Sequence, residues 1–191
     1  IKSFLGKGVD IDARDWDHLT ALIAASSKGY LPMVKHLVKN KADVNARDKD
    51  NITALMEAAM AGHKGIVEHL VGSSSSGKVI DLESPATSGV SPLWLAAGEG
   101  HADVVKVLVN KKADVNNMRA DNVTALMAAC SGGHVDVVKL LLKAGADAAA
   151  RDKDGLTALV NAAENGSVPV VQALLDKRVE VNLLSNTNFS P

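Results

Sequence analysis

The sequence has little cysteine, little proline and few aromatic residues. Among 191 residues there are one cysteine, Cys130, and five prolines, and aromatic residues make up 3%. A single cysteine excludes a framework of intrachain disulfides and agrees with a reducing compartment. Hydrophobic residues still make up 47% of the chain, so a core can form, but it must consist of Ala, Val, Leu and Ile. Such a core suits thin helices that pack closely.

The chain also lacks an excess of one charge and a long apolar run. Its 21 basic and 22 acidic residues leave a net charge of −1, which gives no overall attraction to nucleic acid or an anionic membrane. No apolar run approaches the roughly 18 residues of a membrane span, and no secretory signal is recognisable. We therefore expect the cytoplasm or another reducing intracellular compartment, with the nucleus and organelles left open. Because the chain begins with Ile1, we expect it to be a piece of a longer protein.

What the chain does contain is a periodic landmark. The triplet Thr-Ala-Leu begins at Thr20, Thr53, Thr124 and Thr157, and Ser91-Pro92-Leu93 is a variant of it. The successive spacings are 33, 38, 33 and 33 residues. A period of this size predicts stacked copies of one supersecondary unit. We therefore expect one elongated array rather than separate domains.

Each copy predicts a turn followed by two helices. The landmark Thr or Ser is expected to cap the first helix, and small residues three and four positions after the landmark Leu allow close helix packing. The first helix is expected to end at a glycine, and Val-Val and Leu-Leu pairs four apart predict a second helix with a buried face. The residues expected in a left-handed turn before the landmark are His18, Asn51, Gly89, Asn122 and Gly155. The glycines expected to end the first helices are Gly29, Gly62, Gly100, Gly133 and Gly166.

These residues resemble the ankyrin repeat family, whose pattern runs D-x-x-G-x-T-P-L-H-x-A-A-x-x-G-H, then V-V-x-x-L-L, then G-A-D-V-N. Residues 133–147 are similar to the second half of that pattern, and the resemblance covers nearly the whole chain. It implies an all-α fold, an ankyrin-repeat solenoid of stacked helix-turn-helix units with β-turn or hairpin fingers. The implied repeats of this single domain, residues 1–191, are 15–47, 48–85, 86–118, 119–151 and 152–184, with partial repeats at 1–14 and 185–191.

The chain departs from that pattern in two ways. The proline of Pro-Leu-His is Ala in four copies, and the family's histidine is replaced by Ile23, Met56, Trp94, Met127 or Val160. We expect apolar packing where the family has hydrogen bonds. The second copy also carries five extra residues near 72–77. Residues 72–78 have the G-x-x-x-x-G-K outline of a phosphate-binding loop, but Val79 stands where a hydroxyl is needed, so a flexible Gly/Ser loop is favoured over a modified or partner-contacting one.

Residues with catalytic or metal-binding chemistry do not form a recognisable site. His63, His101 and His134 occupy the same repeat position, a whole unit apart, so a structural role is favoured over a shared metal. Cys130 falls among the small helix residues and is interpreted as a buried thiol. The recurring turn carboxylates are interpreted as solvated charges. We therefore expect no enzyme activity, no metal and no cofactor.

The resemblance implies that a partner binds the concave surface, built from turn tips and exposed sides of the first helices. The implied positions are the two tip residues, the residue before the landmark Thr and the pair before the helix-ending glycine. The candidate partner-binding residues are Trp16, Asp17, Leu19, Lys28, Arg47, Lys49, Asp50, Ile52, Met60, Glu99, Met118, Asp121, Val123, Arg151, Lys153, Asp154, Glu164 and Asn165.

Three features of this surface bear on the partner. Trp16 on a turn tip is the strongest single anchor. The apolar residue before each landmark, such as Ile52, either props the turn against its helix or forms part of an apolar strip that contacts a partner. The mixed signs of Arg47, Lys49 and the neighbouring Asp residues favour a protein or peptide over nucleic acid. No membrane insertion and no small-molecule substrate are expected.

The leading hypothesis is a non-catalytic protein-interaction module. One alternative is a regulatory or targeting domain of a larger enzyme or channel. Another is implied by the resemblance: Asn in an L-x-x-x-x-x-D-V-N context can be hydroxylated by an asparaginyl hydroxylase. Asn45 and Asn116 match that spacing, and Asn182 matches with Glu180 in place of Asp. The competing interpretation is that these side chains satisfy hydrogen bonds of the turns.

Overall fold

A computed structural model describes residues 10–72, 80–83 and 85–177 of the chain. Within these residues the fold is all-α, as the resemblance implies, with ten helices and no strand. The first helices of the five pairs are α2 (Ala21–Ser27), α4 (Ala54–Met60), α6 (Pro92–Gly98), α8 (Ala125–Ser131) and α10 (Ala158–Asn165). The second helices are α3 (Leu31–Lys39), α5 (Lys64–Gly72), α7 (Ala102–Asn110), α9 (Val135–Lys143) and α11 (Val168–Leu175).

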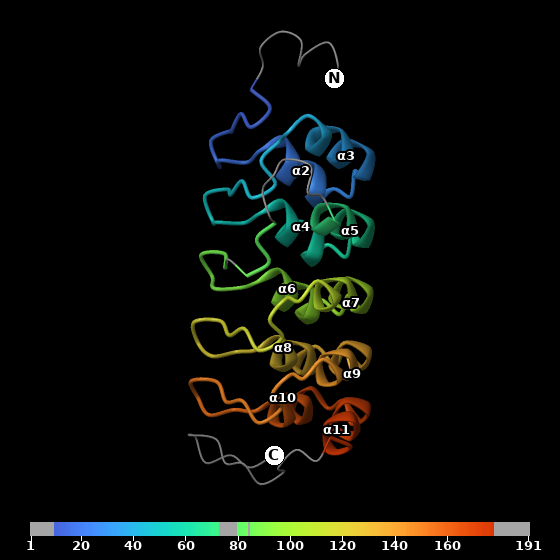
Figure 1. The fold of residues 1–191 in the computed structure, drawn as a ribbon. Helices are drawn as coiled ribbons and strands as arrows, with labels where there is room; N and C mark the ends of the chain where they lie inside the picture. Colours follow the sequence, from blue (N-terminus) through green and yellow to red (C-terminus); the bar gives the residue numbers. More distant parts are fainter. Residues whose placement is uncertain (1–9, 73–79, 84, 178–191) are drawn as a thin grey trace.

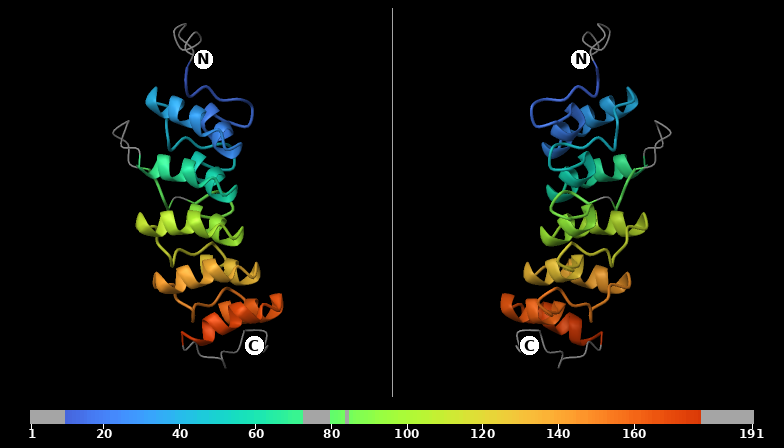
Figure 2. Two further views of the ribbon diagram at one scale, coloured as in Figure 1. Left: turned by 90° about the vertical axis from the view of Figure 1, so that its right-hand side faces the viewer. Right: turned by 90° about the vertical axis from the view of Figure 1, so that its left-hand side faces the viewer.

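The helix pairs are stacked one on the next in chain order (Figure 1). Each first helix packs against its own second helix and against the first helices of the neighbouring pairs, and the second helices form a parallel row behind them. The hairpin loops that precede the first helices project together from one side of the stack, the left in Figure 1. Figure 2 shows the same stack of helix pairs from two further sides. The molecule is therefore the elongated array that the period predicts.

Every landmark hydroxyl caps its helix, as predicted. The side-chain oxygen of the N-cap residue accepts a hydrogen bond from the backbone N–H three residues later, at 3.2 to 3.5 Å in all five pairs. Each cap residue lies in the extended backbone region and is at most 3% exposed. These caps satisfy helix N–H groups that would otherwise be left without a partner inside the stack.

The predicted left-handed turn residues are also confirmed. His18, Asn51, Gly89, Asn122 and Gly155 all have φ between 59° and 82°. The glycine one residue beyond the C-cap of the first helix has positive φ in the first four pairs, and in α10 the C-cap Gly166 itself does. A left-handed residue here lets the chain reverse into the second helix without steric strain at a side chain.

The core consists of small and aliphatic side chains along the stack. Ala58, Ala59, Ala96 and Ala97 are fully buried, which lets the first helices approach closely as predicted. Ala163 differs because it is exposed, and no described helix follows α10 on that side. The residues at the family's histidine position pack apolar surface as expected: Ile23, Met56, Met127 and Val160 are buried, and Trp94 is half-buried.

Two hairpins carry an isolated antiparallel bridge, Arg47 with Thr53 and Met118 with Thr124. These short pairings are the hairpin fingers that the resemblance implies. Of the Gly/Ser-rich insertion, only Gly72 lies within the described residues, at the end of α5. None of the described helices has the length and apolar character required to cross a membrane.

The caps allow a direct test of the fold. Thr124→Ala should lower the free energy of unfolding by about 1 kcal/mol, because it leaves the Met127 N–H without its acceptor. Thr124→Ser should restore most of that stability, since Ser91 performs the same role in α6. Urea denaturation followed by circular dichroism measures both variants. Equal losses for Ala and Ser would contradict the role of the hydroxyl.

Candidate partner-binding surface

The hairpin tips are closed by hydrogen bonds of the same kind in each copy. The N–H of Asp15 donates to the carbonyl of Leu19 at 3.2 Å, and Asp48 donates to Ile52 at 3.1 Å. In both hairpins the carboxylate of the first residue also accepts from two N–H groups across the turn. Asp152 does the same in the fifth copy. The tips are therefore fixed by their own backbone before any partner arrives.

Neighbouring tips are also bonded to one another. The Lys49 N–H donates to the Asp17 carbonyl at 3.0 Å, and the Lys153 N–H donates to the Asp121 carbonyl at 2.9 Å. The Lys49 ammonium donates to the Asp17 carboxylate at 2.8 Å, and this hydrogen bond raises the pKa of Lys49. Both side chains are more than half exposed, so the ion pair adds little stability. The backbone hydrogen bonds are therefore the main link between consecutive tips.

Histidines that recur at the beginning of the second helices join neighbouring helix pairs. The Nε2–H groups of His63, His101 and His134 donate to the carbonyls of Ser27, Met60 and Gly98, at 3.2, 3.0 and 2.9 Å. Each acceptor is the last residue of the preceding pair's first helix. The structural role predicted for these histidines is therefore a hydrogen bond between neighbouring helix pairs. The sequence did not reveal the acceptor, because it is a backbone atom one repeat away.

Asn165 takes over this role in the fifth pair. Ser167 occupies the position of the histidines, and the Asn165 amide instead donates to the Ser131 carbonyl at 2.8 Å. Asn165 was expected to bind a partner, and its side chain is exposed. Its Nδ2 group nevertheless bonds within the stack.

A second column of side chains joins the loops that follow the second helices. The side-chain oxygens of Asp12, Asn45, Glu83 and Asn116 accept from backbone N–H groups one copy further on, at 2.8 to 3.0 Å. The donors are the N–H groups of Asp43, Asp81, Asp114 and Asp147. Asn45 and Asn116 therefore satisfy turn hydrogen bonds, the second of the two interpretations given for them. Asn182 lies outside the described residues.

The predicted partner-binding residues differ widely in exposure. Trp16 is 100% exposed at the first tip, Met118 is 48% exposed and Met60 is 40% exposed. The other candidates that the structure places at the surface are Asp17, Lys28, Lys49, Asp50, Glu99, Lys153, Asp154, Glu164 and Asn165. The half-buried candidates are Leu19, Arg47, Ile52, Asp121, Val123 and Arg151.

The apolar residues before the landmark lie against the core. Leu19 and Val123 pack on the main cluster, and Ile52 packs on a smaller cluster with Met56 and Val90. Val90 itself is only 6% exposed. These four residues therefore prop their hairpins against the helices, which leaves only part of each side chain available to a partner.

Two of the basic candidates brace the hairpins. Arg47 donates to the carbonyls of Asn51 and Pro85 at 3.2 and 3.3 Å and lies 3.5 Å from the Asp81 carboxylate. Arg151 donates to the Gly155 carbonyl at 3.0 Å. Lys49 and Lys153, by contrast, are exposed at their tips. The positive character of this surface therefore comes mainly from the tips.

The sequence reasoning missed one cluster beside the fourth hairpin. The guanidinium carbon of Arg119 lies 5.2 Å from the centre of the Trp94 ring, and Arg119 also pairs with Asp121 through a 2.8 Å bond from Nε. The hydrogen bond from Arg119 lowers the pKa of Asp121 to about 2. The available signal was that Arg119 replaces the turn aspartate found at positions 15, 48 and 152. The substitution exchanges an intra-turn carboxylate for a cation over an aromatic ring.

Cys130 is buried, as the sequence predicts. Its burial raises the pKa of the thiol to about 12. A thiol in this environment is protonated at neutral pH and is not a nucleophile. In the described part of the chain, no three His, Cys, Asp or Glu side chains are grouped so that they could hold a metal ion.

The repeated helix pairs and hairpins agree with a comparison against protein families. A model of ankyrin repeats, three copies long, matches residues 1–82, 22–119, 76–152 and 93–185. The chain belongs to the ankyrin-repeat family. Ankyrin repeats are generally protein-interaction modules, and the family is typically non-catalytic. No curated protein matched this ankyrin-repeat sequence.

The contribution of the histidine column can be measured with a glycine variant. A Cβ added to Gly100 would lie 2.6 Å from the His134 ring at a φ of 79°. Gly100→Ala should lower stability by about 2 kcal/mol, roughly 1 from the left-handed backbone and about 1 from the displaced hydrogen bond. Urea denaturation gives the value.

Gly145→Ala is the matched control. Gly145 has a φ of 93°, but no described atom lies within 4 Å of its added Cβ, and Lys112 occupies the equivalent position with positive φ. Gly145→Ala should therefore lower the free energy of unfolding by about 1 kcal/mol only, the cost of a left-handed backbone at alanine. If both variants lose the same stability, His134 contributes nothing to the stack.

The Arg119 pair predicts a pH dependence. Because the folded-state pKa of Asp121 is about 2, the pair stabilises the fold above the ordinary pKa, and this stability is lost as the pH falls towards 2. Arg119→Gln should raise the pKa of Asp121 towards about 3.9, measured by carboxyl-carbon NMR titration. Arg14→Gln, in another hairpin, should leave it unchanged. A pKa that is the same in all three proteins would refute the pairing.

Proposed function

We propose that this ankyrin domain binds a partner protein or peptide along the face formed by its hairpin tips and first helices, with Trp16 as the main anchor. The observation that carries the proposal is the full exposure of Trp16 on a tip held by hydrogen bonds. A tryptophan in water gives the fold no burial energy. Aromatic side chains of this kind dominate the binding energy of protein interfaces.

The rigidity of the surface supports this proposal. The tips are closed by their own hydrogen bonds, and neighbouring tips are bonded to each other. A partner therefore meets side chains whose backbone is already ordered, so less conformational entropy is lost on binding. The proposed face extends along all the stacked hairpins on one side of the molecule (Figure 1).

The middle of the face offers room for a closely lying chain. Met60, Gly98 and Ser131 occupy equivalent positions at the ends of α4, α6 and α8. Met60 presents an adaptable apolar side chain, whereas Gly98, Ser131 and Gly132 present little or no side chain. We propose that a peptide or helix of the partner lies over α6 and α8 and contacts Met60 at one end.

The charges of the face suit a protein rather than a nucleic acid. Its cations are interleaved with carboxylates, as in the pairs Lys49–Asp17 and Arg119–Asp121. A phosphate backbone would be repelled by these carboxylates, whereas a protein surface of mixed charge can complement them. We therefore infer a polypeptide partner.

A pull-down from the source cells with quantitative mass spectrometry tests the proposal. Trp16→Ala combined with Met60→Ala should reduce recovery of specific partners, by about 30-fold in affinity if the pair contributes about 2 kcal/mol. Because both side chains are exposed, the unfolding midpoint should stay unchanged.

The control variant combines Tyr30→Ala with Val168→Ala. These side chains are 60% and 76% exposed and lie at the beginning of second helices, away from the tips. They remove similar apolar surface at positions that are not among the candidate partner-binding residues. Unchanged recovery with the Trp16 and Met60 variant, or equal losses with the control, would overturn the assignment of this face.

A further inference from the structure

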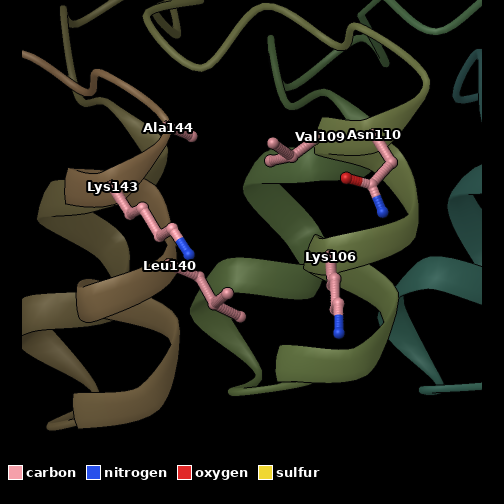
Figure 3. Close-up of a pocket in the computed structure, with 6 residues that line it drawn as sticks. All are labelled: Lys106, Val109, Asn110, Leu140, Lys143 and Ala144. Atoms are coloured by element: carbon pink, nitrogen blue, oxygen red, sulfur yellow. The ribbon is translucent and has the colours of Figure 1, made fainter.

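A second surface of interest lies on the opposite side of the stack, between the second helices α7 and α9. A hollow of about 250 Å³ opens there, lined by Lys106, Val109, Asn110, Leu140, Lys143 and Ala144. In Figure 3 the side chains of Val109 and Leu140 point into the space between the two helices, and Lys143 extends beside it. The hollow therefore combines an aliphatic floor with basic edges.

The helical spacing of these residues explains why they share a face. Lys106, Val109 and Asn110 lie at i, i+3 and i+4 on α7, which places them on one side of that helix. Leu140, Lys143 and Ala144 repeat the same spacing at the end of α9. At the position of Ala144, the preceding copy has Lys111. The short side chain of Ala144 leaves the floor of the hollow uncovered.

The hollow continues towards the loop after α7. A second depression, of about 470 Å³, shares Val109, Asn110 and Ala144 with the first. It is completed by Lys112, Ala113, Asp114 and Val115. We call the two together the α7–α9 groove. Together the two depressions offer room for a few side chains of an extended or helical segment.

The lysines of the groove are not paired, in contrast to the cations of the hairpin face. Within the described residues, no carboxylate lies within ion-pair distance of Lys106, Lys112 or Lys143. The one carboxylate in the groove, Asp114, already accepts the Asn116 N–H at 2.9 Å. Three cations therefore face one anion along an apolar floor.

The position of Lys106 differs in charge along the row of second helices, with Lys35 on α3 and a glutamate on α5. There Glu68 occupies the position of Lys106 and lies 3.6 Å from Lys64 on the same helix. On α7 and α9 that position is Lys106 and Lys139. This position is therefore acidic in the second pair and basic in the first, third and fourth.

We propose that the α7–α9 groove binds an acidic segment of a partner protein that carries an aliphatic side chain. The aliphatic side chain rests on Val109, Leu140 and Ala144, and flanking carboxylates bond to the three lysines. Charge complementarity selects this occupant, because a basic or neutral segment leaves the lysines unpaired and a purely anionic polymer leaves the floor exposed to water. The groove lies apart from the hairpin face, so it provides a second, independent docking surface.

The test uses the whole 191-residue chain and a defined probe. The probe is a fluorescein-labelled octapeptide of sequence Asp-Glu-Leu-Asp-Glu-Leu-Glu-Asp, followed by fluorescence anisotropy. Two companion peptides replace either all acidic residues by Gln or both Leu residues by Ser. The acidic-aliphatic probe should bind saturably and about tenfold more tightly than either companion, since each companion lacks one of the two interactions.

Variants of the groove locate the binding. Lys143→Glu should weaken the probe about tenfold, because an attraction becomes a repulsion. Lys139→Glu is the matched control: it makes the same charge change on the exposed side of α9 without lining the groove, and it should change affinity by less than about twofold at 150 mM salt. Ala144→Leu should also weaken binding, since it fills the floor without altering charge.

Several outcomes would overturn the proposal. One is the absence of saturable binding to the octapeptide, and another is an equal effect of the Lys143 and Lys139 variants. Displacement of the probe by oligo-dT of the same charge, with retained sensitivity to Lys143→Glu, would make the groove a phosphate site. Concentration-dependent association of the chain in sedimentation velocity, abolished by Ala144→Leu, would make it a contact between copies. Circular dichroism of each variant confirms that the fold is intact.

Discussion

Close contact between successive helix pairs is the constraint on which the rest of this structure depends. A single pair of seven- to nine-residue helices has too little surface to enclose a core, so each pair buries its apolar face against the next. Fully buried alanines such as Ala58 and Ala96 keep the helices close together. Ala163, in the last described pair, is exposed because no described helix follows to cover it. Burial of these alanines therefore depends on the next pair in the stack.

The same stacking distance governs the polar interactions. Histidines at the beginning of the second helices reach back by one copy, while side-chain oxygens such as that of Asn116 reach forward by one copy. Each such bond adds only about 1 kcal/mol, but an unpaired carbonyl or N–H inside the stack would cost more. The two columns therefore fix how each pair is rotated on its neighbour, and with it the line of hairpin tips.

The two sides of the stack differ in whether their basic side chains are paired with carboxylates. On the hairpin side, cations such as Lys49 and Arg119 are bonded to carboxylates and to neighbouring turns, so the exposed apolar group Trp16 stands on an ordered frame. On the second-helix side, Lys106 and Lys143 edge an aliphatic groove without a carboxylate partner among the described residues. One side therefore offers an apolar anchor, and the other offers unpaired charge beside apolar surface.

The sequence by itself determined the repeat, the order of turn and helices, the caps and the left-handed residues. These depend on neighbours within about four positions, where Thr124 and Asn122 already specify the geometry. It also identified Trp16 as a surface aromatic. Only the tertiary structure decided which side chains bond between copies, such as Asn165 with the Ser131 carbonyl, and which lysines remain unpaired. Those outcomes depend on the spacing and rotation of atoms more than 30 residues apart, which the packing of whole helices sets and a local pattern does not contain.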